Sequence, residues 1–135
     1  MFCRILARQL PASFVAEDET TAAFMDLRQP VPGHVLVVPR RHAPTIYELT
    51  PDEGAAVMNL AIRVARSLRK VFSPAGLSLT QSNGAIAGQE VDHFHLHLQP
   101  RKSGDGILRV YPHSAPAPTA RAQLDELAAQ LRPHI

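Results

Sequence analysis

The alternation of apolar and polar residues predicts a sheet built within the first hundred residues. Ser13–Ala16 and Thr21–Leu27 can pair as a hairpin across the polar run from Glu17 to Glu19. His34–Pro39 is rich in β-branched residues, which is typical of a buried strand. Leu77–Gln81 has the composition of a further strand.

The clearest helix begins at Thr50. This residue is a good N-cap, Pro51 suits the first helical position, and Glu53 completes a capping box. One apolar face follows at spacings of three and four residues, and it ends before Pro74 and Gly76. The members of that face are Val57, Leu60, Ala61, Val64, Leu68 and Val71.

The carboxy-terminal part predicts a short second helix after a stiff connector. Pro112, Pro116 and Pro118 supply the stiffness, and Thr119 can cap the helix. Its apolar face comprises Leu124, Leu127, Ala128 and Leu131. Together the elements predict an α+β fold with a mostly antiparallel sheet and one main helix. We expect residues 1–135 to form a single domain, with a core over 2–106 and an extension over 107–135.

Composition narrows the class of protein. Apolar residues make up 45% of the chain, and 14 Lys and Arg against 12 Asp and Glu leave only a small basic surplus. We therefore expect no nucleic-acid partner. The apolar runs fall short of the roughly 20 residues that span a membrane, so we expect no membrane partner. The single cysteine, Cys3, excludes an internal disulfide, which fits a cytoplasmic location.

The most informative segment is His93–Gln99, where histidines alternate with bulky apolar residues. On a strand, successive side chains point to opposite faces. The strand prediction therefore places the imidazoles of His93, His95 and His97 on one face. Phe94, Leu96 and Leu98 then point to the core.

Three clustered imidazoles suit nucleophilic chemistry at phosphorus. A neutral imidazole is a competent nucleophile, and attack by His95 gives a phosphoramidate that water or an amine resolves. The charge that builds on the phosphate oxygens needs fixed donors. The candidates are His93, His97, Asn83, Gln89 and the N–H groups of Gly84–Gly88.

Two other functions fit the same residues. His-x-His on a strand is also a metal-ligand spacing, so the cluster could serve a metal-dependent hydrolase with His34, His42 or Cys3 as further ligands. Alternatively, the chain could be a dimeric module that binds a nucleotide without turning it over.

At this point the chain resembles the histidine triad (HIT) family. The family pattern His-φ-His-φ-His-φ-φ, with φ apolar, here is HFHLHLQ, and Gln99 departs from it at the last position. The match continues through FCRILARQLPAS, AFMDLRQPVPGHVLVVPRRH, LTPDE and SNGAIAGQEVDHFHLHLQPRKSGDG. The resemblance implies a five-stranded antiparallel sheet with a main helix, paired as a homodimer, and no cofactor.

The resemblance also implies a role for each matching residue. His95 is the expected nucleophile, His97 binds the phosphate and supports the leaving group, and His93 orients His95. His42 is a fourth active-site histidine, whereas the residue pattern alone would make it a surface residue. The substrate is a purine nucleotide ester, anhydride or phosphoramidate, with AMP as the expected moiety.

Nucleotide contacts follow in the same way. Asp26 matches the carboxylate that binds the ribose hydroxyls, although a solvated turn is the simpler interpretation of an aspartate there. Asn83 and Gln89 match phosphate contacts. Glu90 stands where many members carry Ser or Thr, and an ionised carboxylate leaves only its backbone N–H as a donor. Positions around the base are matched by Phe2, Ile5, Phe24 and Leu27, which the pattern alone would place in the core.

Some family members hold a structural zinc through Cys-x-x-Cys and two histidines. Only the second of these cysteines is present, as Cys3, so we expect no metal. His97 indicates the hydrolase side of the family, because the transferase branch carries Gln there. The PRKSGDG stretch is more similar to the dinucleoside-polyphosphate hydrolase branch and its bacterial relatives than to the phosphoramidase branch.

Overall fold

The computed structural model describes residues 1–107 and 114–135 of the chain. Within these residues, contacts separate two units, Met1–Asp105 and Gly106–Ile135. Pro112 of the predicted connector lies outside the described residues.

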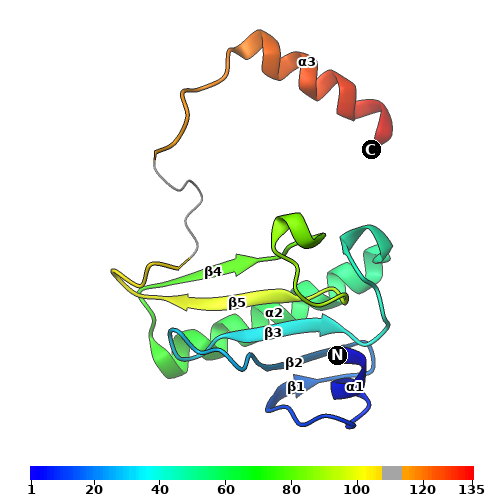
Figure 1. The fold of residues 1–135 in the computed structure, drawn as a ribbon, viewed down its shortest axis with the longest axis vertical. Coiled ribbons are helices and arrows are strands. Elements are labelled where there is room, and N and C mark those ends of the chain that lie inside the picture. Colours follow the sequence, from blue (N-terminus) through cyan, green and yellow to red (C-terminus); the bar gives the residue numbers. More distant parts are fainter. Residues whose placement is uncertain (108–113) are drawn as a thin grey trace. The chain divides into compact units, whose positions relative to one another are not determined.

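The first unit is built on a five-stranded antiparallel sheet in the order β1-β2-β3-β5-β4 (Figure 1). This confirms the predicted α+β class, and the hairpin and the strands near His34–Pro39 and Leu77–Gln81 lie where expected. The strand bounds are β1 Phe14–Glu17, β2 Thr21–Met25, β3 Val35–Pro39, β4 Gly76–Thr80 and β5 Leu96–Arg101. The helical elements of this unit are α1 Phe2–Leu6, η1 Ile46–Glu48, α2 Pro51–Phe72 and η2 Ala85–Ala87.

Helix α2 confirms the predicted main helix and its capping box. The Thr50 hydroxyl accepts the backbone N–H of Glu53, and the Glu53 carboxylate accepts the Thr50 backbone N–H. The prediction that Val71 belongs to the buried face is wrong, because Val71 is 70% exposed although it follows the apolar spacing. Phe72 is exposed as well, so the last turn of the helix is only partly buried.

Strand alternation divides the core between the two faces of the sheet. Val35 and Val37 pack against α2, whereas Leu36 and Val38 pack against α1 on the other face. The register pairs Leu36 with His97, which places His97 on the α1 face. Because α1 is only five residues long, it covers part of that face and leaves room for a site beside it.

The second unit contains α3 Arg121–Leu131 and η3 Arg132–His134. The predicted carboxy-terminal helix is present, but Ala120 and not Thr119 occupies the N-cap. The side chains of Leu124, Leu127 and Leu131 are exposed. Among the described residues, no helix combines the length and the apolar character needed to cross a membrane.

Candidate active site

The triad segment differs from the predicted strand. Strand β5 begins at Leu96, so His97 is the member of the triad that lies on a strand, and His93 and His95 precede it. Extending the β3–β5 register would place Phe94 opposite Pro39, which has no N–H to donate. The Pro39 carbonyl instead accepts the His93 ring at 2.9 Å, and the Phe94 N–H donates to the carbonyl of Ala43 at 2.6 Å. These contacts end the ladder and turn the first two histidines into the site.

His95 has one ring nitrogen held and the other left for chemistry. Its Nδ1 lies 2.7 Å from the carbonyl oxygen of His93. Since a carbonyl only accepts, the ring hydrogen resides on Nδ1 and the lone pair on Nε2. The ring is buried and lies 4.8 Å from the His97 ring, centroid to centroid. This arrangement presents Nε2 of His95 as a nucleophile of defined tautomer.

On one side of His95, three side chains form what we call the thiol cluster: Cys3, His42 and His93. His93 Nε2–H donates to Pro39, so its Nδ1 accepts, and the Cys3 sulfur lies 3.4 Å from that Nδ1. The same sulfur lies 3.5 Å from Nδ1 of His42. Burial lowers the pKa of His93, and the neighbouring His42 and His95 add to the effect. His42 therefore lies beside the first triad histidine, as a fourth member of the histidine cluster.

On the other side of His95 lies a second group, which we call the carboxylate cluster: Asp26, His34 and His97. His34 Nδ1 lies 3.0 Å from the carbonyl of Arg28, so this nitrogen carries the hydrogen. His34 Nε2 then accepts Nδ1–H of His97 at 2.9 Å. The Asp26 carboxylate lies 3.9 Å from the His34 ring.

His97 is kept neutral by its surroundings. Burial and, after it, the repulsion of His95 and His34 lower its pKa to about 4, with Asp26 and Glu90 partly offsetting these effects. Its Nδ1 hydrogen is directed to His34, so its Nε2 is an acceptor until the ring gains a proton. A bound anion would stabilise that protonated form.

The residues predicted around the base separate into two sets. Phe2, Ile5 and Phe24 are buried together in the core on the α1 face, as the residue pattern alone had indicated. The Phe2 ring also meets the His95 ring edge to face at 5.2 Å. Leu27 does not join them, because its side chain is 95% exposed.

The two predicted amides shape the loop over the site. Gln89 accepts the N–H of Gly84 at 2.7 Å and donates to the carbonyls of Pro44 and Val91. Asn83 accepts the N–H of Ile46 at 2.8 Å. Both amides therefore hold backbone in place, and a phosphate contact from Gln89 would require it to release one of these bonds.

Glu90 is exposed and forms an ion pair with Arg28 at 3.1 Å. The pair joins the loop after β2 to the loop before β5. The negative charge of Glu90 raises the pKa of His97, so Glu90 acts electrostatically on the carboxylate cluster.

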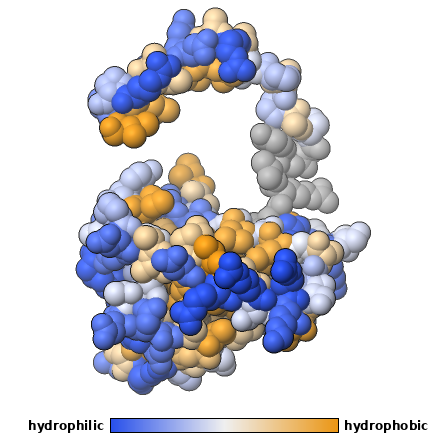
Figure 2. All heavy atoms as spheres, turned by 180° about the vertical axis from the view of Figure 1, so that it is seen from behind, coloured by the Kyte–Doolittle hydropathy of each residue, from blue (hydrophilic) through white to orange (hydrophobic). Residues whose placement is uncertain are grey.

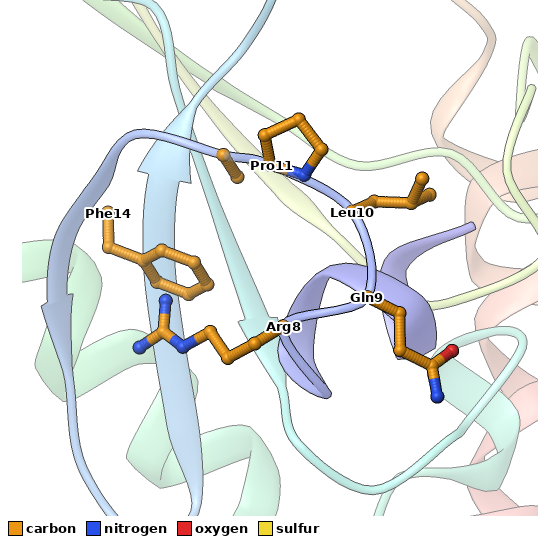
Figure 3. A pocket seen from close by; sticks show the side chains of 6 residues that line it. Arg8, Gln9, Leu10, Pro11 and Phe14 are labelled. Atoms are coloured by element: carbon orange, nitrogen blue, oxygen red, sulfur yellow. The ribbon is translucent and has the colours of Figure 1, made fainter.

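An open hollow elsewhere on the first unit lacks a side chain suited to nucleophilic catalysis. It lies where α1 leads into β1, and the Arg8 guanidinium lies 3.7 Å above the Phe14 ring (Figure 3). Its lining consists of Arg8, Gln9, Leu10, Pro11, Ala12 and Phe14 and contains no histidine. We therefore place the candidate site at the histidines.

Sequence reasoning considered His34 and Cys3 only as extra metal ligands. The structure adds their contacts with His97 and His93. The strand register could have revealed His34, since it precedes Leu36 by two residues and Leu36 pairs with His97.

Residues 7–104 match the family model described as the HIT domain. The protein named Protein hit from Bacillus subtilis is 39% identical over 112 residues, which cover 82% of this chain and 77% of that protein. The adenosine 5'-monophosphoramidase hnt1 of Schizosaccharomyces pombe is 34% identical over 110 residues, which cover 82% and 80%.

The asymmetrical bis(5'-nucleosyl)-tetraphosphatase of Schizosaccharomyces pombe is 40% identical over 85 residues, covering 63% of this chain and 47% of that protein. Among solved structures, a member of the HIT family from Bacillus subtilis has a TM-score of 0.92 and 30% identity. That alignment covers 100% of this chain and 96% of the other.

Proposed function

This chain belongs to the histidine triad (HIT) family, and we propose that it is a nucleotide hydrolase in which His95 attacks the α-phosphate of a purine nucleotide. The observation that carries the proposal is the 2.7 Å hydrogen bond from His95 Nδ1 to the His93 carbonyl. It orients the ring and leaves the Nε2 lone pair for phosphorus. The carbonyl also stabilises the imidazolium that forms during attack.

The reaction balances in two steps. In the first, Nε2 of His95 forms a bond to the α-phosphorus while the bond from phosphorus to the leaving oxygen or nitrogen breaks. The electron pair departs with the leaving group, which accepts the proton that His97 gained when the anion was bound. In the second, water attacks phosphorus and gives a proton to Nε2 of His97, the P–N bond breaks, and its electron pair returns to His95.

The other predicted contacts supply binding. Asp26 accepts the ribose hydroxyls and Leu27 offers an exposed apolar surface to the base. The floor beneath is formed by Phe2, Ile5 and Phe24. His42 and His93 hold the geometry from the thiol cluster.

The related phosphoramidase and tetraphosphatase indicate two substrate classes, nucleotidyl-amines and dinucleoside polyphosphates. Both present an α-phosphate bound to a nucleoside and to a separate leaving group. Because attack by His95 is common to both, we propose that the leaving-group side determines the preference.

We also propose that the chain acts as a homodimer. Figure 2 views the molecule from the side opposite Figure 1 and shows apolar side chains among charged ones on that surface. Helix α2 exposes Met58, Ile62 and Phe72, and the edge strand β4 exposes Leu79. A second copy that extends the sheet at β4 would cover an open strand edge.

Intact-mass spectrometry under neutral quench tests the covalent step. Wild type, His95→Ala and the exposed-histidine control His134→Ala are each mixed with adenosine phosphoramidate or diadenosine tetraphosphate. We expect an AMP adduct on wild type and on the control, and loss of adduct and turnover in His95→Ala. Turnover that survives in His95→Ala contradicts the proposal. Nucleotide binding by wild type without any turnover would favour a binding module, and turnover abolished by chelator would favour a metal-dependent hydrolase.

A further inference from the structure

The carboxylate cluster has the composition of a metal site. Asp26, His34 and His97 each offer a ligand atom, and these atoms lie within 4.8 Å of one another. Asp26 directly follows β2, His34 directly precedes β3, and His97 lies within β5. All three are half-buried, so an ion from solvent can reach them while water screens them only partly.

The geometry needs a side-chain adjustment to hold an ion. Ligand atoms at 2.0–2.2 Å from a tetrahedral Zn²⁺ lie roughly 3.3–3.6 Å apart. The His34 Nε2 and His97 Nδ1 atoms lie 2.9 Å apart, just below that range. The Asp26 carboxylate lies 3.9 Å from the other His34 nitrogen, Nδ1, so an ion held by His34 Nε2 requires the Asp26 side chain to turn towards it. Backbone contacts already hold two ligands, because Asp26 accepts the Arg28 N–H at 2.7 Å and His34 donates to the Arg28 carbonyl.

The protonation states are also suitable. His34 keeps its hydrogen on Nδ1, so its Nε2 lone pair is available for a metal. His97 frees Nδ1 by carrying its hydrogen on Nε2 instead.

We propose that Asp26, His34 and His97 form an exchangeable Zn²⁺ site that competes with the nucleotide. Two imidazoles and one carboxylate suit Zn²⁺ and leave a fourth position for water. The competition rests on the proposed function, which assigns Asp26 to ribose and His97 to phosphate. Metal occupancy itself requires only the three side chains.

The thiol cluster is the main competitor for the same ion, since Cys3, His42 and His93 also gather three ligand atoms. The two clusters differ in chemistry, because one contains sulfur and the other contains only nitrogen and oxygen. Co²⁺ distinguishes them, since a thiolate ligand adds a sulfur-to-cobalt charge-transfer band that nitrogen and oxygen ligands lack.

The test titrates metal-free protein with CoCl₂ and follows its absorption. Cys3→Ser removes the sulfur site, and Cys3→Ser/His34→Gln removes both. We expect Cys3→Ser to bind Co²⁺ without the charge-transfer band, to release it to Zn²⁺, and to bind it at least tenfold more weakly when AMP saturates the protein. The double variant should bind at least tenfold more weakly, with a far-UV circular dichroism spectrum matching that of Cys3→Ser.

Three results overturn the proposal: no Co²⁺ binding by Cys3→Ser, equal binding by the double variant, or AMP that strengthens the binding of Co²⁺. Turnover is measured separately on Cys3→Ser with and without Zn²⁺, where we expect inhibition that chelator reverses. If the protein turns over no nucleotide but Cys3→Ser binds Co²⁺ through His34, the hydrolase proposal fails and the metal site stands.

Discussion

The rings of His34 and His97 stack with centroids 5.2 Å apart and planes 27° apart, and a 2.9 Å hydrogen bond joins them. Through this bond His34 keeps the His97 hydrogen on Nδ1. The carbonyl of Arg28 in turn keeps the hydrogen of His34 on its own Nδ1. The tautomer of His97 is therefore determined through two successive hydrogen bonds, which end at a backbone carbonyl that cannot titrate.

We predict that His34→Ala lowers kcat more than it raises KM. A neutral hydrogen bond of this kind contributes about 0.5–1.5 kcal/mol, which corresponds to roughly a two- to tenfold loss in rate. Nitrogen NMR of His97 should show its hydrogen shared between Nδ1 and Nε2 in the variant. His134→Ala serves as the control. An unchanged His97 spectrum alongside reduced activity would mean that His34 acts on the fold and not on the tautomer.

Protein stability should depend on pH through His97. In the unfolded chain a histidine has a pKa of about 6.5, whereas burial lowers the pKa of folded His97 to about 4. Between these values the unfolded state binds a proton that the folded state does not. The free energy of unfolding therefore falls as pH drops from 6.5 towards 4.

The loss would be about 3 kcal/mol for a fully buried ring, and roughly half of that for a ring partly open to solvent. Urea unfolding at pH 7 and pH 4.5 measures it. We expect His97→Gln to show a shallower dependence than wild type, and His134→Gln to match wild type. Equal slopes in all three proteins would assign the pH dependence to other groups, such as His93.

Substitution by alanine should destabilise the protein at Gly33 but not at Gly54. The φ of Gly33 is +103°, and a Cβ there would lie 3.0 Å from Leu68 and 3.1 Å from Phe72 and Pro100. Backbone strain and overpacking together predict that Gly33→Ala destabilises by about 2–4 kcal/mol. Gly54 lies in α2, and a Cβ there would meet nothing within 4 Å. Gly54→Ala should stabilise by up to about 1 kcal/mol through helix propensity, and chemical unfolding compares the two.

The sequence predicted much of the fold because local signals agreed with the packing. The Thr50–Glu53 capping box marked the start of α2, and the β-branched run marked β3. Val71 is exposed although it follows the apolar spacing, because periodicity describes only the helix, whereas burial depends on what the rest of the fold packs against it. No local pattern contains that information.

The site was harder to predict for a related reason. Alternation in His93–Gln99 predicted three histidines on one continuous strand, yet Pro39 on the neighbouring strand interrupts the ladder. The link from His34 to His97 spans 63 positions and follows from the strand register. Such contacts depend on pairing between strands, which the alternation of one segment does not specify.

The ion pair between Arg28 and Glu90 yields a prediction about nucleotide affinity. Glu90 lies near the expected phosphate position, and Arg28 offsets its charge at 3.1 Å. Arg28→Ala should weaken AMP binding by about two- to fivefold, as for an exposed pair, because the glutamate charge is then uncompensated. Glu90→Ser should strengthen binding, and Arg28→Ala in the Glu90→Ser background should have little effect.

Isothermal titration calorimetry with AMP at low and high salt measures the affinities of all four proteins. The differences should shrink at high salt because solvent ions screen exposed charges. An equal loss from Arg28→Ala in both backgrounds would instead mean that Arg28 contacts the nucleotide directly.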